Sequence, residues 1–252
     1  MGAAVRVGSL FSGIGGLELG LERAIPGAHT VFQVEQNTYA RAVLAKHWPN
    51  AQRFDDVRQA GAHNLPPCDL LCGGFPCQDI SVAGKRAGIN GERSGLWAEY
   101  ARIIGELRPR YIVVENVSAL LAGGMGRVLG DLASCGYDAL WDCVPAAAVG
   151  APHRRDRVFI IAFRDMADPD CARLEGRLSE SLQECTGQRL TGQGGTRPSR
   201  VQDHWLIESG VGRVATGVPR RVDRLRCLGN AVVPQVAEVV GRVVMQLEEG
   251  SA

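Results

Sequence analysis

Lysine is nearly missing from this sequence, since only Lys46 and Lys85 occur among 28 lysine and arginine residues. The formal net charge of +1 excludes a uniformly basic protein. The positive charge is carried by arginine, whose planar guanidinium binds phosphates and guanine edges well. Between residues 186 and 230, eight arginines stand against three acidic residues, which predicts one local basic surface.

Long apolar runs are also missing. No run approaches the ~20 residues of a membrane span, and the N-terminus has no charged start followed by an apolar stretch. The eight cysteines include no Cys-x-x-Cys step, which excludes the common zinc-binding patterns. We therefore expect no membrane association, no metal and a reduced cytoplasmic setting. At 252 residues, the chain is long enough for one core, or for one core and a small appendage.

The most informative segment contains a cysteine in an unusual context. Cys77 follows Gly73-Gly74-Phe75-Pro76, on the loop after an apolar run that ends at Cys72. Reactive side chains collect at strand ends in α/β proteins, so Cys77 is a candidate nucleophile. A single cysteine is more often a small buried apolar residue, and taken alone Cys77 has this alternative.

A second segment has the pattern of a strand, a glycine turn and a helix. Leu10-Phe11-Ser12-Gly13-Ile14-Gly15-Gly16 precedes apolar residues at helical spacing. Such a turn lets a nucleoside approach the backbone closely, although a turn without a ligand has the same pattern. The next predicted strand, residues 30–34, ends at Glu35, whose carboxylate suits ribose hydroxyls. These residues do not separate a nicotinamide cofactor from S-adenosylmethionine.

Two further predicted strands have charged residues at their ends. The apolar run 111–114 leads into Glu115 and Asn116, and a basic cluster with Arg155 and Arg157 precedes the strand 158–162. One interpretation is that both the acidic strand end and the basic cluster are solvated surface. The basic cluster would equally suit a phosphate or a base edge.

The order of apolar segments predicts the fold class. Strand-like and helix-like segments alternate over residues 1–163, with a helix at 97–107. This alternation predicts an α/β protein with a doubly wound sheet. Polar, glycine-rich sequence follows from residue 164 to about 223. A last helix, 234–247, then places six apolar side chains on one face. These are Val236, Val239, Val240, Val243, Val244 and Leu247.

Taken together, these segments resemble the DNA cytosine-C5 methyltransferase family, in its compact phage or bacterial form. The family shares five motifs with this sequence. They are Phe-Ser-Gly-Ile-Gly-Gly from Phe11, Pro-Cys-Gln around Cys77, Glu-Asn-Val from Glu115, Arg-x-Arg ending at Arg157, and Leu-Gly-Asn-Ala-Val-Val-Pro ending at Pro234. One departure is Ser9, where many members have an acidic residue. The resemblance implies a Rossmann-like doubly wound sheet of the S-adenosylmethionine-dependent methyltransferase type, with a small, irregular target recognition region.

The resemblance implies covalent catalysis by Cys77. A thiolate added at cytosine C6 makes C5 reactive enough to accept a methyl group. Glu115 would protonate or hydrogen-bond N3, and Arg157 would hold the O2 edge. Arg155 would support the same pocket. A stacked base cannot reach these groups, so the target nucleotide must be flipped out of the duplex.

The resemblance also implies the contacts to S-adenosylmethionine. Phe11 would lie against the adenine, Glu35 would bind the ribose hydroxyls, and Asp56 would accept a hydrogen bond from the adenine amino group. The other contacts would come from the glycine turn, beside the methionine part, and from residues that close the remaining side. These are Gly13, Gly15, Gly16, Leu96, Asn230 and Val232.

We expect three regions along the chain. Residues 1–163 form the catalytic and cofactor-binding domain, 164–223 a short target recognition region, and 224–252 a segment that returns to the catalytic domain. The recognition region is shorter than is usual in the family, and the target sequence is not readable from it. The arginine-rich stretch from Arg213 to Arg226 is its expected DNA contact.

The expected function is cytosine methylation in double-stranded DNA by a cytoplasmic monomer. It would act as an orphan enzyme or as the modification half of a restriction system, with a cognate endonuclease as partner. One alternative is methylation of tRNA, against which stands the lack of a Cys-Phe-Thr signature. Another is a weakly active or non-catalytic DNA-binding derivative, against which stand Cys77, Glu115 and Arg157.

Overall fold

The computed structural model describes residues 4–76, 95–164 and 220–249. Cys77 and most of the expected target recognition region lie outside these ranges. The strands are β1 (Arg6–Leu10), β2 (His29–Val34), β3 (Gln52–Phe54), β4 (Leu70–Gly73), β5 (Tyr111–Val117), β6 (Asp138–Pro145) and β7 (Asp156–Phe163). The helices are α1 (Gly16–Ala24), α2 (Thr38–His47), α3 (Leu96–Leu107), α4 (Leu120–Gly123), α5 (Met125–Ser134), the 3-10 helix η2 (Ala146–Val149), α8 (Arg221–Asn230) and α9 (Pro234–Glu249).

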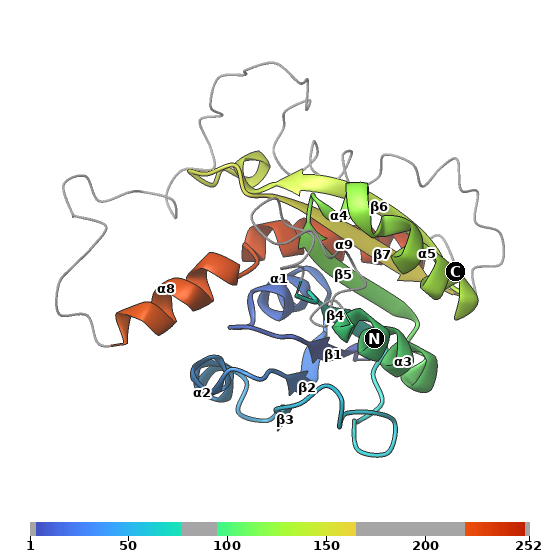
Figure 1. Cartoon of the computed structure of the whole chain (residues 1–252), viewed down its shortest axis with the longest axis horizontal. Coiled ribbons are helices and arrows are strands. Elements are labelled where there is room, and N and C mark those ends of the chain that lie inside the picture. Colours follow the sequence, from blue (N-terminus) through green and yellow to red (C-terminus); the bar gives the residue numbers. More distant parts are fainter. Residues whose placement is uncertain (1–3, 77–94, 165–219, 250–252) are drawn as a thin grey trace.

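The strands form one seven-stranded sheet with the order β3-β2-β1-β4-β5-β7-β6, flanked by helices (Figure 1). This confirms the predicted α/β fold class. The helices expected at 97–107 and 234–247 are present as α3 and α9. The sequence interpretation named neither α5 nor β6.

The sheet contains a point where the direction of chain progression reverses. From β1 the chain moves outward to β2 and β3, and it then returns to place β4 on the other side of β1. All pairs from β3 to β5 are parallel, so the carboxyl ends of five strands meet at one edge. The loops after β1 and β4 diverge at the reversal and leave a crevice, which is where open α/β sheets bind ligands.

Strand β7 runs opposite to its neighbours. It is antiparallel to β5 and to β6, and Val117 at the end of β5 pairs with Arg157 at the start of β7. Because of this reversal, the start of β7 lies at the same edge as the carboxyl ends of the parallel strands. Arg157 is thereby placed beside Glu115.

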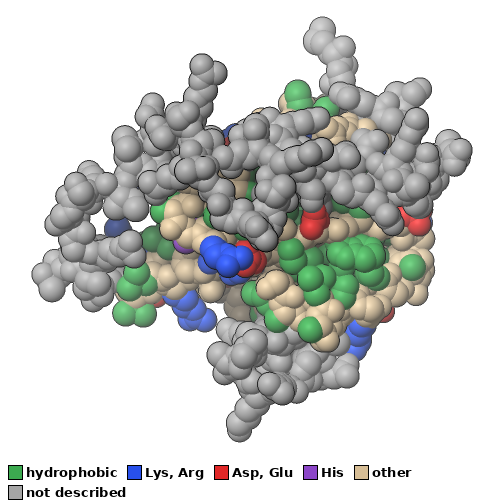
Figure 2. Space-filling view, turned by 90° about the horizontal axis from the view of Figure 1, so that it is seen from above, with side chains coloured by type: hydrophobic (Ala, Val, Ile, Leu, Met, Phe, Trp, Pro, Cys, Tyr) green, Lys and Arg blue, Asp and Glu red, His purple; other side chains and the backbone are tan. Residues whose placement is uncertain are grey.

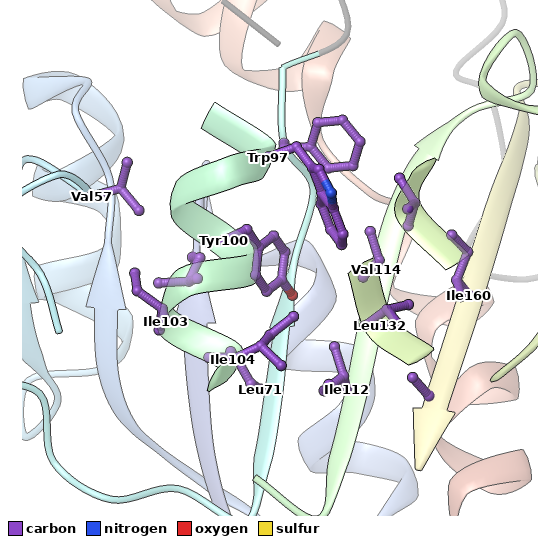
Figure 3. Packing of buried hydrophobic residues seen from close by; sticks show 14 of the residues in the cluster. Val57, Leu71, Trp97, Tyr100, Ile103, Ile104, Ile112, Val114, Leu132 and Ile160 are labelled. Atoms are coloured by element: carbon purple, nitrogen blue, oxygen red, sulfur yellow. The ribbon is translucent and has the colours of Figure 1, made fainter. Parts of the chain in front are cut away.

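Each face of the sheet is covered by a separate set of helices. Alternate strand residues such as Val113 pack with α1 and α9, whereas Ile112 and Val114 pack with α3 and α5. Figure 3 shows Trp97, Tyr100 and Ile104 of α3 directed towards this second face. The period of two along each strand divides the core into these two layers.

Helices α1 and α9 approach each other closely at glycines. A Cβ atom on Gly20 would lie 2.3 Å from the carbonyl oxygen of Pro234, and one on Gly241 would lie 2.6 Å from the Cβ atom of Ala24. The apolar face predicted for α9 is buried at all six positions. The stretch Val222–Glu248 is long and apolar enough, by length and composition alone, to cross a membrane. This stretch is divided between two helices, α8 and α9. The packing of α9 in the core accounts for its apolar residues.

Candidate cofactor and catalytic site

A cavity of about 1080 Å³ opens at the carboxyl edge of the sheet. Its wall contains residues that follow the strands β1 to β4, the carboxyl end of β5, and the joint between α8 and α9. The expected site residues on this wall are Phe11, Gly13, Gly16, Glu35, Asp56, Leu96, Glu115, Arg157, Asn230 and Val232. The fold therefore brings together segments more than 200 positions apart in the sequence.

The glycine turn after β1 is tied to the end of β2 by Glu35. One carboxylate oxygen accepts from the Gly13 amide at 2.8 Å and the other from the Asn37 amide at 2.7 Å. Gly13 has a φ of 56°, and among the described residues no other atom lies within 4 Å of the place that a Cβ would take. This side of the turn is open, so a ligand can approach the backbone there.

Gly15 was expected beside the methionine part of the cofactor, but it does not face the cavity. It is not among the described residues that line the cavity. Its φ is 87°, and a Cβ there would lie 2.3 Å from the Trp48 ring. This glycine thus permits the turn and the packing of Trp48 beneath it, whereas Gly13 faces the cavity.

The remaining expected cofactor residues form the sides of the cavity. The Phe11 ring lies 6.2 Å from that of Tyr100, which supports it from α3. Asp56 accepts from the Arg58 amide at 2.9 Å, so the turn after β3 is locally closed. A Cβ on Gly16 would lie 2.3 Å from the carbonyl oxygen of Val232, so the α8–α9 joint rests directly on the start of α1.

A buried ion pair forms one end of the cavity. The Nε atom of Arg157 lies 2.9 Å from a carboxylate oxygen of Glu115. Burial raises the pKa of Glu115, and the charges of Arg157 and Arg155 oppose this rise without cancelling it. Gly74 passes so close that a Cβ there would lie 2.6 Å from the other oxygen of Glu115. The pair is therefore enclosed by the loop that leads to Cys77.

That loop is fixed on its described side. The side-chain amide of Asn116 donates to the carbonyl oxygen of Phe75 at 3.1 Å, and Pro76 lines the cavity. Pro76 is the last described residue before Cys77. Asn116 holds this loop beside Glu115, a role that the sequence interpretation did not give it.

Arg155 is not among the described residues that line the cavity. Its guanidinium donates to the carbonyl oxygen of Gly229 at 2.7 Å and so connects the loop before β7 to α8. Its φ is 37°, an uncommon value for a residue with a side chain. Burial, followed by the charge of Arg157, lowers its pKa.

The arginines near the C-terminus are divided between different surroundings. Arg226 lines the cavity, and the guanidinium of Arg220 lies 5.9 Å from the centre of the Tyr39 ring. Arg224 is exposed, and Arg213 lies outside the described residues. On the face shown in Figure 2, the described basic side chains form separate groups, and the one near the centre lies next to an acidic side chain.

Glu18 and Cys227 are among the further residues on the cavity wall that the sequence interpretation missed. Glu18 lies in the first turn of α1, and Cys227 lies in α8. The available signal for Glu18 was an acidic residue two positions after the glycine turn. Cys227 gave no such signal, because its position depends on how α8 returns to the sheet.

Comparison with known proteins agrees with this arrangement. The family described as C-5 cytosine-specific DNA methylase matches residues 5–192. The chain belongs to this family. The matched range includes all seven strands of the sheet.

Two relatives show how far the similarity extends. The chain is 40% identical to the type II methyltransferase M2.BsuMI of Bacillus subtilis over 65% of its own length and 44% of that protein's. It is 32% identical to the type II methyltransferase M.HhaI of Haemophilus parahaemolyticus, over 62% and 48% of the two lengths. The chain thus spans about half the length of the curated relatives that it matches.

Solved structures give the same fold. A putative DNA modification methyltransferase encoded within an Escherichia coli prophage is 30% identical, with a TM-score of 0.54 over 64% of this chain and 47% of that one. The methyltransferase EhMeth of Entamoeba histolytica has a TM-score of 0.57 over 66% and 55% of the two chains, at 22% identity. The latter likeness concerns the fold alone.

Membership of the methylase family implies S-adenosylmethionine as the cofactor. The cavity suits this ligand, because the open face of Gly13 admits close backbone contact and Glu35 and Asp56 supply acceptors for hydroxyl and amino groups. Within the described residues, no group of three or more His, Cys, Asp or Glu side chains is placed to hold a metal ion.

Proposed function

We propose that this chain transfers a methyl group from S-adenosylmethionine to C5 of a flipped cytosine in double-stranded DNA, through a covalent bond between Cys77 and cytosine C6. The observation that carries the proposal is one continuous cavity. The Glu115–Arg157 pair lies at its end beside Pro76, and its walls contain the glycine turn, Glu35 and Asp56.

The proposed cofactor contacts follow the wall of the cavity. Glu35 binds the ribose hydroxyls, Asp56 accepts from the adenine amino group, and Phe11 lies against the adenine. The turn of Gly13, Gly15 and Gly16 holds the methionine part, with Gly15 shaping the turn from behind. Leu96, Asn230 and Val232 close the remaining side. When bound, the cofactor supplies an electrophilic methyl group on its sulfonium.

The proposed chemical steps use Cys77 and Glu115. The Cys77 thiolate forms a bond to cytosine C6, and the displaced electron pair makes C5 nucleophilic while N3 takes the proton of Glu115. C5 then takes the methyl group, and S-adenosylhomocysteine is released. A water molecule takes the C5 proton, and the electrons of that C–H bond re-form the C5–C6 double bond, which expels the thiolate and restores the aromatic ring. N3 returns its proton to Glu115, so the residues end as they began.

The surroundings of Glu115 support its role as proton donor. A carboxyl group gives up a proton at neutral pH only if its pKa is raised, and burial raises that of Glu115. The Nε atom of Arg157 lies 2.9 Å from Glu115, which supports the proposed contact of this guanidinium with the O2 edge of the same base. We assign Arg155 a supporting role, since it fixes the loop before β7 to α8.

The test of the proposal is covalent trapping. DNA that carries 5-fluorocytosine should form a stable adduct with the wild-type protein. C5 of this base carries fluorine in place of the proton that must be removed, so the Cys77 thiolate is not expelled. Cys77→Ser should form no adduct and should lose methylation while retaining cofactor binding. Cys135→Ser, a matched change at a half-buried cysteine outside the cavity, should behave as wild type. Substantial activity in Cys77→Ser would contradict the proposal.

A second assay addresses the substrate. We propose double-stranded DNA as the partner, and a monomer in the cytoplasm that acts as an orphan enzyme or with a cognate restriction endonuclease. We also propose the division into regions 1–163, 164–223 and 224–252. Bisulfite sequencing of DNA from an expressing host should show methylated cytosines in one sequence context. Methylation of tRNA and not of DNA would support the alternative substrate.

A further inference from the structure

Beneath the floor of the cavity lies a group of polar side chains that the proposed chemistry does not use. Ser9 in β1, Ser12 in the loop after it, Glu18 in α1 and Gln33 in β2 are all buried. Three of them, Ser9, Ser12 and Glu18, also line the cavity. Polar groups are costly to bury, so each needs a partner or a function.

Glu18 is the member whose burial is hardest to explain. It is 0% exposed, and neither carboxyl oxygen has a hydrogen-bond partner among the described residues. The nearby Ser9, Ser12 and Gln33 side chains favour its ionised form, but burial outweighs them and raises its pKa to about 7. A buried carboxylate in this state is stabilised by any cation that comes near it.

The serines connect Glu18 with the cavity. The Ser9 and Ser12 hydroxyl oxygens lie 2.8 Å apart, and either can be the donor. An ionised Glu18 attracts the Ser9 hydroxyl proton towards itself, which leaves the Ser9 oxygen to accept from Ser12, so that the Ser12 oxygen keeps a free lone pair for the cavity. A protonated Glu18 removes this preference. The charge of Glu18 therefore determines whether the floor of the cavity offers an acceptor or a donor.

The glycine turn limits which part of the cofactor lies above this floor. Under the proposed function, on which this inference rests, the methionine part lies beside Gly13 and Gly16, and Glu18 follows two residues after Gly16. That part carries an ammonium group. We propose that Glu18 is a positioning residue for this ammonium group and acts through the Ser12 hydroxyl, which accepts a hydrogen bond from it.

Other titratable groups around Glu18 do not supply this charge. Cys72 faces it from β4, and burial raises the pKa of that thiol well above its ordinary value, so it stays neutral. Glu22, one turn further along α1, accepts from the Trp48 ring nitrogen at 2.9 Å and from the Thr30 amide at 2.7 Å. The side chains that β1 and β2 place near Glu18 are Ser9 and Gln33, which do not titrate. The α8–α9 joint places only a backbone carbonyl oxygen near Gly16.

The test compares two ligands on the full chain by calorimetry. These are S-adenosylhomocysteine and its analogue with the amino group replaced by hydrogen. Wild type should bind the first at least about tenfold more tightly, as expected for a hydrogen bond to a charged group. Glu18→Gln and Ser12→Ala should each lose most of this preference, with affinity for the deamino analogue changed less than about twofold.

A matched control and a pH series separate this role from a structural one. Glu22→Gln, on the same helix but outside the cavity wall, should keep the wild-type preference. Affinity of wild type for S-adenosylhomocysteine should rise between pH of about 5.5 and 7.5 as Glu18 ionises, and Glu18→Gln should show a flat profile. Equal weakening of both ligands in Glu18→Gln would overturn the inference. If wild type binds neither ligand, the proposed function itself fails.

Discussion

Two buried glutamates at this site have different surroundings, and we therefore propose different uses for them. Glu115 lies 2.9 Å from a guanidinium nitrogen, while Glu18 has only neutral polar neighbours. Burial raises the pKa of both carboxyl groups. For Glu115 the paired arginine keeps the carboxyl oriented, which suits proton transfer to a bound base. For Glu18 an ionised carboxyl has no cation nearby within residues 4–76, 95–164 and 220–249, which suits a ligand that brings one.

Replacement of Glu115 tests the first use. Glu115→Gln keeps the shape and a hydrogen bond, but it cannot deliver a proton to N3. We expect turnover to fall by at least about a hundredfold, the low end for general acid catalysis, while cofactor affinity barely changes. Steady-state methylation and calorimetric binding measure the two quantities. Unaltered turnover with weakened cofactor binding would instead assign Glu115 to the cofactor pocket.

The pH dependence of stability tests the burial of Glu18. Its pKa is about 7 in the folded protein, so between pH of about 4.5 and 7 the folded state holds a proton that the unfolded chain releases. This contribution to stability is present at low pH and is lost as the pH rises through the folded pKa. Without cofactor, Glu18→Gln should therefore gain stability relative to wild type by roughly 3 kcal/mol between pH 5 and 8. Denaturant unfolding at both pH values measures it, and an unchanged difference would mean that Glu18 is solvated.

At the scale of elements, the site depends on two arrangements that local sequence does not encode. The segments for β1, β2, β4, β5 and β7 were predictable, because each is a short apolar run with a charged or glycine-rich end. The antiparallel direction of β7 was not, since one strand's pattern carries no information on its neighbours. Yet this direction places Arg157 beside Glu115.

The close contact of α1 and α9 is the second arrangement, and Gly20 tests it. Gly20→Ala places a methyl group 2.3 Å from the Pro234 carbonyl oxygen, so the helices must separate and stability should fall by about 1–3 kcal/mol. The control is Gly130→Ala in α5, where no other atom in the described part of the chain lies within 4 Å of the added carbon. That change should stabilise the protein by about 0.4–1 kcal/mol. Thermal unfolding compares them, and equal effects would show that α1 and α9 are not tightly packed in solution.

At the scale of the whole molecule, the motifs predicted which residues meet but not how each one contributes. Glu35, Asp56, Glu115 and Val232 reach one cavity, as expected from the resemblance. Gly15 and Arg155 do not line the cavity; they lie against Trp48 and Gly229. The motifs did not predict this, because these contacts depend on three-dimensional packing. Glu18 escaped prediction since its burial follows from the sheet and not from helical spacing.

The cavity is lined both by the first strands of the sheet and by the α8–α9 joint near the C-terminus. The reactivity of Cys227 tests whether this joint covers a bound cofactor. Cys227 lines the cavity from α8, and burial and the nearby Glu35 carboxylate raise its pKa. If S-adenosylhomocysteine fills the cavity, maleimide should reach Cys227 only in the free protein. At about 100 times the Kd, labelling should slow by about 100-fold. Cys135, half-buried and outside the cavity wall, should react at an unchanged rate. Peptide mass spectrometry follows both sites in one sample, and equal rates at Cys227 with and without ligand would show that the α8–α9 joint does not close over the bound cofactor.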